Sequence, residues 1–213
     1  MTSDAPTVRL YLIRHGQTDG NITQRLRGED SAEDALTELG WQQARAVAEV
    51  LAAVRPPPVQ VYASPYLRAR QTGLAIAQRL GVPLTVLEGA QEIHAGDWRG
   101  RPYRDMHERA AEMTAPDGHF GYPGGESLRA VGMRFEAALL ALPLQPEQAV
   151  VVVSHGAALT ALLARLSGQD ERDTWLAGQY QHRNAALTEL LWTPGQPPQL
   201  LRIADAGHLD RLT

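Results

Sequence analysis

The chain has 213 residues, of which 44% are hydrophobic, and its formal net charge is −4. This length and composition suffice for one hydrophobic core, so we expect a single domain over residues 1–213. The negative charge argues against a nucleic-acid-binding protein, which normally carries a basic stripe. There is no cysteine, which excludes disulfides and thiolate nucleophiles, and all 20 basic residues are arginine. Lysine Schiff-base chemistry and a Walker-type phosphate lysine are therefore excluded as well.

Nothing in the sequence predicts membrane insertion. Residues 1–7 have neither a basic nor an apolar stretch of the kind found in signal peptides, and no apolar run approaches the ~18 residues of a membrane span. We expect a cytoplasmic protein with no membrane or nucleic-acid partner. Monomer and homodimer both stay open.

Strands and helices alternate along the chain. In chain order, we expect a strand over 8–13, a helix over 36–54, a strand over 59–63, a helix from Ser64 and Pro65 to about Leu80, a strand over 82–87, an insertion over 101–123 that contains a helix over 103–113, a helix over 126–142, a strand over 149–154, a helix over 157–166, and strands over 185–192 and 200–203. The helices follow from apolar residues at a spacing of three to four, and Ser64 has the residue type of a helix cap. The alternation predicts an α/β fold, a three-layer α/β/α sandwich with a mostly parallel central sheet.

Two histidines directly follow predicted strands. The first strand runs into Arg14-His15-Gly16, and the strand over 149–154 runs into His155-Gly156. Open α/β sheets place their ligand sites at the carboxyl ends of their strands. The two histidines are therefore predicted to meet at one edge of the sheet.

Three further segments supply side chains to the same edge. Arg68 lies in the first turns of a helix that follows a strand, although this segment on its own would favour a solvated helix charge. Glu92 follows the third strand and precedes Gly96-Asp97-Trp98, which offers a carboxyl group beside flexible glycines. Gly124-Gly125-Glu126-Ser127 opens a helix, where Glu126 also fits a simple N-terminal charge.

Together these segments resemble the histidine phosphatase superfamily, which contains cofactor-dependent phosphoglycerate mutases and many small-molecule phosphatases. The resemblance covers nearly the whole chain in the family's order, from Arg14-His15-Gly16 to Asn184-Ala185-Ala186-Leu187-Thr188. It implies a phosphoglycerate mutase-like fold and the following site: His15 as the phosphorylated nucleophile, Glu92 as the proton donor, Arg14, Arg68 and His155 as the rest of the phosphate pocket, and Thr18, Asn21 and Gly156 as further phosphate or substrate contacts.

These roles agree with the chemistry of phosphate esters. A phosphate monoester brings about two negative charges, which two arginines and a protonated His155 would neutralise without a metal or other cofactor. His15 must be neutral to attack, and a hydrogen bond from its second nitrogen to the Gly16 carbonyl would fix its tautomer. A nearby phosphate dianion would favour the protonated form of Glu92, which can then donate to the leaving oxygen.

The leading hypothesis is a phosphatase that hydrolyses small phosphorylated metabolites through a phosphohistidine intermediate. A phosphoglycerate mutase is the first alternative, but family mutases carry a lysine after the catalytic glutamate, and this chain has none. A non-catalytic module that binds a phosphorylated ligand is the second, and it would have no use for a proton donor. The natural substrate stays open.

Several residues have two readings. His94 either contacts substrate or is structural, and Arg25 and Arg27 either bind a second anionic group or are surface charges. The acidic segment over 28–36 is either a solvated loop or an element that repels acidic substrates. No pattern in the sequence assigns a function to His208 in the tail. The spacing of the other histidines predicts no metal site.

Overall fold

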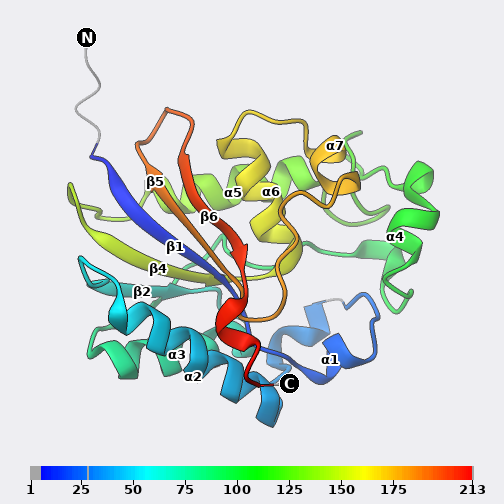
Figure 1. Cartoon of the computed structure of the whole chain (residues 1–213). Helices are drawn as coiled ribbons and strands as arrows, with labels where there is room; N and C mark the ends of the chain where they lie inside the picture. Colours follow the sequence, from blue (N-terminus) through cyan, green and yellow to red (C-terminus); the bar gives the residue numbers. More distant parts are fainter. Residues whose placement is uncertain (1–5, 28, 213) are drawn as a thin grey trace.

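The computed structural model describes residues 6–27 and 29–212, and it is built around one six-stranded sheet (Figure 1). The strand order is β3-β2-β4-β1-β5-β6. Their bounds are β1 Val8–Arg14, β2 Gln60–Ala63, β3 Leu84–Val86, β4 Ala149–Ser154, β5 Leu187–Trp192 and β6 Gln199–Asp205. The first four strands pair in parallel, whereas β5 and β6 are antiparallel to their neighbours. The sheet is therefore mostly parallel, as predicted.

Helices cover both faces of the sheet, which gives the three predicted layers (Figure 1). On one face, α2 (Glu38–Ala53) and α3 (Leu67–Leu80) pack on the apolar side chains of β1, β2 and β4. On the other face, α5 (Leu128–Leu140) and α6 (Gly156–Leu166) form the larger core. The remaining helices are short: α1 Asp19–Ile22, α4 Asp105–Glu108, α7 Glu171–Leu176, and the 3₁₀ helices η1 Glu29–Glu33, η2 Gly96–Trp98, η3 Ala110–Glu112 and η4 Gly207–Leu209.

The register of the parallel strands explains where the two histidines meet. Arg14 pairs with Ser154 at the carboxyl ends of β1 and β4, so the next residue in each strand, a histidine, leaves the sheet at the same level. On the other side of β4, Ala63 of β2 pairs with Val153. Ser64 therefore leaves the sheet at that edge too.

The loop after β1 is held by a close approach to the start of α2. A Cβ on Gly16 would lie 2.4 Å from the Gly40 carbonyl oxygen, a distance that carbon and oxygen do not tolerate. The Thr37 amide donates to the Gln17 carbonyl at 2.9 Å, which ties the same two segments together. The nucleophile candidate is thus carried on a backbone packed directly against a helix.

Two local predictions are wrong, and one helix was not predicted. The helix expected over 103–113 is only α4 and η3, because the backbone breaks at Arg109 (φ −119°) and most side chains of this stretch face solvent. Helix α3 begins at Leu67 with Tyr66 at its cap, so Ser64 is not the cap. Helix α7 was not expected from the sequence.

The structure also bears on the membrane prediction. In the ranges that the structure describes, no helix combines the length and apolar character that a bilayer crossing requires. The prediction for residues 1–7 falls largely on residues 1–5, which lie outside the described part.

Candidate active site

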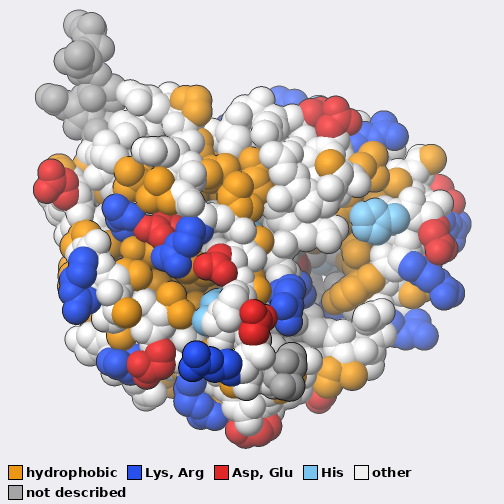
Figure 2. Space-filling view, in the orientation of Figure 1, with side chains coloured by type: hydrophobic (Ala, Val, Ile, Leu, Met, Phe, Trp, Pro, Cys, Tyr) orange, Lys and Arg blue, Asp and Glu red, His pale blue; other side chains and the backbone are white. Residues whose placement is uncertain are grey.

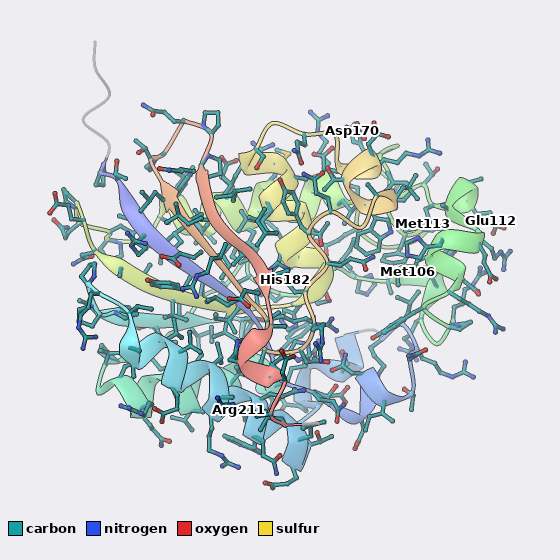
Figure 3. All side chains as sticks on the ribbon, viewed as in Figure 1. Met106, Glu112, Met113, Asp170, His182 and Arg211 are labelled. Carbon is teal, nitrogen blue, oxygen red and sulfur yellow. The ribbon has the colours of Figure 1, made fainter. Side chains whose placement is uncertain are left out.

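A cavity of about 510 Å³ opens at the carboxyl ends of β1 and β4. The space-filling view shows this face hollowed beside the α4 segment (Figure 2). The insertion and α7 contribute both apolar and charged residues to the lining, namely Tyr103, Arg104, Met106, His107 and Trp175, and Figure 3 shows Met106 on α4. The lining includes the predicted site residues Arg14, His15, Thr18, Asn21, Arg68, Glu92 and Gly156.

His15 is held as a neutral imidazole. Its Nδ1 lies 2.7 Å from the Gly16 carbonyl oxygen. Because a carbonyl only accepts, Nδ1 carries the proton and Nε2 presents its lone pair, as the sequence predicted. Burial, followed by the charges of Arg68 and Arg14, holds the pKa of His15 well below its usual value. The imidazole is therefore unprotonated near neutral pH.

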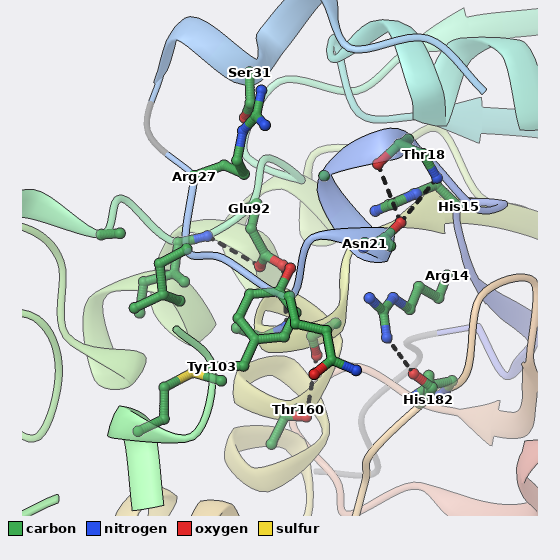
Figure 4. Close-up of a pocket in the computed structure, with 18 of the residues that line it drawn as sticks. Arg14, His15, Thr18, Asn21, Arg27, Ser31, Glu92, Tyr103, Thr160 and His182 are labelled. Carbon is green, nitrogen blue, oxygen red and sulfur yellow. Dashed lines mark hydrogen bonds between the residues drawn. The ribbon is translucent and has the colours of Figure 1, made fainter. Parts of the chain in front are cut away.

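Two arginines flank this imidazole. The Arg68 Nε donates to His15 Nε2 at 3.2 Å, and its Nη1 donates to the Ser31 carbonyl at 2.6 Å. Arg14 is fixed by a 2.6 Å hydrogen bond from Nη1 to the His182 carbonyl (Figure 4), while its buried Nε has no partner in the described part of the chain. Burial lowers the pKa of each guanidinium, and the charge of Glu92 opposes this. Both donors are anchored at one end and free to bind an oxyanion at the other.

His155 lies against His15 with ring centroids 5.2 Å apart, but it does not line the cavity. Its side chain is fully buried, and its Nε2 lies 2.8 Å from the Ser64 hydroxyl oxygen. Burial, followed by the charges of Arg68, His15 and Arg14, holds its pKa well below the usual value. In the unliganded site, two buried arginines beside His155 disfavour a third positive charge, and the protonated His155 expected with a bound phosphate stays a prediction.

Glu92 lies at the N-terminus of α6. Its Oε1 accepts from the Ala158 amide at 2.9 Å, and its Oε2 accepts from the Ala157 amide at 3.3 Å. These helix-terminal N–H groups have no partner within the helix and favour an anion. The carboxyl group thus lies beside Gly156, at the wall of the cavity.

The loop that carries Glu92 is clamped from behind by α5. Arg134 donates to the Glu92 carbonyl at 3.1 Å and to the Gly89 carbonyl at 2.7 Å, and it also binds the Glu126 carboxylate. Glu126 in turn accepts from the His94 amide at 2.9 Å. Glu126 is therefore more than an N-terminal helix charge, because it holds the loop in place.

Thr18 and Asn21 line the cavity and are joined to each other. The Asn21 Oδ1 accepts from the Thr18 amide at 3.0 Å and from the Asn184 amide nitrogen at 3.0 Å (Figure 4 shows the Thr18 side). Asn184 also donates to the His15 carbonyl at 3.1 Å. The motif before β5 thus braces the loop after β1, while a direct contact of Thr18 or Asn21 with phosphate stays a prediction.

His182 was not identified as a site residue from the sequence. It is buried, it lines the cavity, and its ring lies between the Tyr180 carbonyl (2.8 Å) and the Thr188 hydroxyl (2.7 Å). Burial lowers its pKa to about 4. No sequence pattern distinguished it from the other scattered histidines; its only signal was its place two residues before Asn184.

The structure shows where the residues with two possible roles lie. His94 lines the cavity, whereas Arg25 does not and donates to the Gly100 carbonyl. Arg27 lines the cavity and pairs with Asp34 at 3.0 Å, which neutralises charge on both. His208 lies 3.0 Å from the Ala185 carbonyl, a structural contact at the back of the site.

The segment over 28–36 contributes backbone as well as charge. Besides Asp34, it supplies the Ser31 carbonyl that orients Arg68. Residue 28 and the side chains of Glu29 and Asp30 lie outside the described part of the structure. Among the residues described, no group of three or more His, Asp or Glu side chains is arranged to hold a metal ion.

Comparisons with known proteins agree with this geometry. A profile of the histidine phosphatase superfamily (branch 1) matches residues 10–206. Glucosyl-3-phosphoglycerate phosphatase of Mycobacterium tuberculosis is 31% identical over 208 residues, which cover 91% of each chain. Adenosylcobalamin/alpha-ribazole phosphatase of Salmonella typhimurium is 32% identical over 79% of this chain and 84% of that protein.

Solved structures are similar over the same extent. The native structure of a mycobacterial glucosyl-3-phosphoglycerate phosphatase has a TM-score of 0.76 at 28% identity and covers 94% of this chain and 100% of that one. Phosphoserine phosphatase from Entamoeba histolytica, in complex with 3-phosphoglyceric acid, also has a TM-score of 0.76, at 25% identity, and covers 95% and 99%. The chain belongs to the histidine phosphatase superfamily, branch 1.

Proposed function

We propose that the protein is a metal-independent phosphatase that hydrolyses phosphate monoesters of small metabolites through a phosphohistidine at His15. One observation carries the proposal: the His15 Nε2 lone pair is presented to the Arg68 guanidinium while Nδ1 is committed to the Gly16 carbonyl. A nucleophile held beside a cationic donor is what phosphoryl transfer to nitrogen requires. The similar proteins named above are phosphatases, and their names specify small phosphorylated substrates.

The reaction proceeds in two halves. The His15 Nε2 lone pair attacks phosphorus, the bond from phosphorus to the ester oxygen breaks, and that oxygen takes a proton from Glu92 as the alcohol leaves. Glu92 must hold this proton beforehand, which the bound phosphate dianion favours and the α6 amides oppose. Water then attacks the phosphohistidine and gives its proton to Glu92. The electron pair of the P–N bond returns to Nε2, which releases inorganic phosphate and restores the enzyme.

The cavity supports a substrate larger than phosphate alone. Its volume of about 510 Å³ leaves room for a leaving group beyond the phosphoryl seat, between the insertion and α7. We propose a small phosphorylated metabolite in the cytoplasm as the substrate.

The test is hydrolysis of an aryl phosphate in the presence of a chelator. We expect turnover with the chelator, and a loss of at least ~10³-fold in His15→Ala, because a nucleophile and the groups around it act as a unit. His119→Ala is the matched control, since this exposed histidine lies outside the cavity that contains His15. Rapid quench in acid and base identifies the intermediate, because a phosphohistidine is lost in acid and survives in base.

Hydrolysis that depends on an added metal, or that survives in His15→Ala, would contradict the proposal. Incubation with a phosphoglycerate and a bisphosphate primer separates the mutase alternative, which predicts isomer interconversion faster than release of phosphate. Phosphate affinity without turnover would indicate a binding module.

A further inference from the structure

The side chain of His155 is fully buried, and its contacts decide which of its two ring nitrogens carries the proton. Its Nε2 contacts Ser64, and its Nδ1 is buried with no hydrogen-bond partner in the part of the chain that the structure describes. A neutral imidazole has one donor and one acceptor nitrogen, and which is which depends on their partners. The tautomer decides whether Nδ1 attracts or repels a phosphoryl oxygen.

The hydrogen bonds of Ser64 settle the tautomer. The Ser64 hydroxyl is fully buried, and its oxygen accepts, at 3.4 Å, from the Tyr66 amide. Within the described residues, the 2.8 Å contact with His155 Nε2 is the one place where the hydroxyl hydrogen meets an acceptor. If Nε2 were instead the donor, this hydroxyl hydrogen and the Nδ1 lone pair would both be buried without a partner among the described residues. With Nε2 as the acceptor, only the Nδ1 hydrogen lacks one, and each unpaired buried group costs about 1–3 kcal/mol. Ser64 is therefore the donor and Nε2 the acceptor.

We propose that Ser64 is a positioning residue that holds His155 as the neutral tautomer protonated on Nδ1, so that Nδ1 can donate to a phosphoryl oxygen. The site then needs no third positive charge to offer a third donor. The inference rests on the proposed function for the identity of that oxygen, but the tautomer itself is a property of the unliganded protein. The low pKa of His155, caused by burial and by the two arginines, is consistent with it.

The same arrangement explains why Ser64 does not cap α3. A cap hydroxyl accepts from an amide of the first helical turn, but here Tyr66 occupies the cap position and the Ser64 hydroxyl faces β4 and His155. Ser64 and His155 are 91 positions apart in sequence, and the adjacent parallel strands β2 and β4 bring them together.

The first test is nitrogen NMR of histidine-labelled, unliganded protein, which distinguishes the two tautomers by the shifts of Nδ1 and Nε2. We expect a protonated Nδ1 and an acceptor Nε2 at His155 in the wild type. A protonated Nε2 would overturn the proposal without any variant. In Ser64→Ala, we expect the Nδ1-protonated signature to be lost, and in Ser64→Thr, which keeps the hydroxyl, to be retained.

The second test is competitive inhibition by inorganic phosphate. We expect Ser64→Ala to weaken it about tenfold, the effect of one misdirected hydrogen bond. Ser154→Ala is the matched control: it removes another buried serine hydroxyl, bound to the Ala90 carbonyl at 2.8 Å, next to His155 in sequence but not bonded to its ring. It should leave both the tautomer and the phosphate inhibition unchanged.

The outcomes separate the two proposals. Equal phosphate inhibition in Ser64→Ala and wild type, or equal weakening in Ser64→Ala and Ser154→Ala, would overturn the role of Ser64. The absence of hydrolysis in a wild-type protein that shows the expected tautomer would instead overturn the proposed function.

Discussion

Acid is expected to weaken the fold through His182, because this ring is buried in a neutral form. Its pKa falls from the usual 6.5 to about 4 on burial, while the unfolded chain keeps the ordinary value. Well above pH 6.5 neither state binds the proton, and no stability is lost. As the pH falls from 6.5 toward 4, the unfolded state gains a proton that the folded state does not, so the free energy of unfolding decreases.

The magnitude follows from the two pKa values. Between about pH 7.5 and about pH 5, the single site removes ~2 kcal/mol from the free energy of unfolding. The wild type is expected to lose more than this, since His15 and His155 also have lowered pKa values for the same reason. The contribution of His182 is therefore isolated by comparison with His182→Gln, which has no titrating ring.

Urea unfolding of both proteins at the two pH values measures the effect. We expect the loss between about pH 7.5 and about pH 5 to be ~2 kcal/mol smaller in His182→Gln than in the wild type. Any destabilisation that the variant shows at both pH values cancels in this difference. His119→Gln, which replaces an exposed histidine, should keep the wild-type loss. Equal losses in His182→Gln and wild type would show that His182 does not contribute to the acid destabilisation.

Three further changes test the packing and the site. Phe135→Ala empties a fully buried position of the larger core and should cost about 3–5 kcal/mol in urea unfolding; a loss under ~1 kcal/mol would contradict this packing. Thr37→Ala removes the hydroxyl that caps α2 and should lower the free energy of unfolding by about 1 kcal/mol. An unchanged free energy of unfolding would show that this cap does not stabilise the helix. Gly125→Ala would place a Cβ 2.1 Å from the His94 carbonyl oxygen, so we expect it to displace the Glu92 loop and lower kcat by about 10²-fold; unchanged kcat would show that this contact does not position Glu92.

The core of the site was predictable because its signals are local. His15 and His155 each follow a run of apolar, β-branched residues, and the edge of a parallel sheet brings such strand ends together. The same reasoning predicted the Gly16 carbonyl as the partner of the His15 ring, since the two residues are adjacent in sequence. The roles of Arg68 and Glu92 came from the family resemblance, and their proximity came from the structure.

The supporting contacts were not predictable, because they join residues far apart in sequence. Arg134 reaches the Glu92 carbonyl across 42 positions, and Arg14 reaches the His182 carbonyl across 168. No periodicity of hydrophobic residues encodes such a pair. The helix expected over 103–113 is interrupted for a different reason. Neither α4 nor η3 has a buried residue, so little tertiary packing supports one continuous helix there.

Residue types and their local order thus predicted the layers of the fold and the strand ends that carry the histidines, and they excluded cysteine and lysine chemistry. These depend on residue type and on repeats of two to four residues, which act within one strand or helix. Folding in three dimensions was needed to bring Ser64 to His155 instead of the cap of α3, and to bury two arginines beside His155, which lowers its pKa. Hydrogen-bond partners and pKa values depend on what surrounds a group in space, and the folded chain alone sets those surroundings.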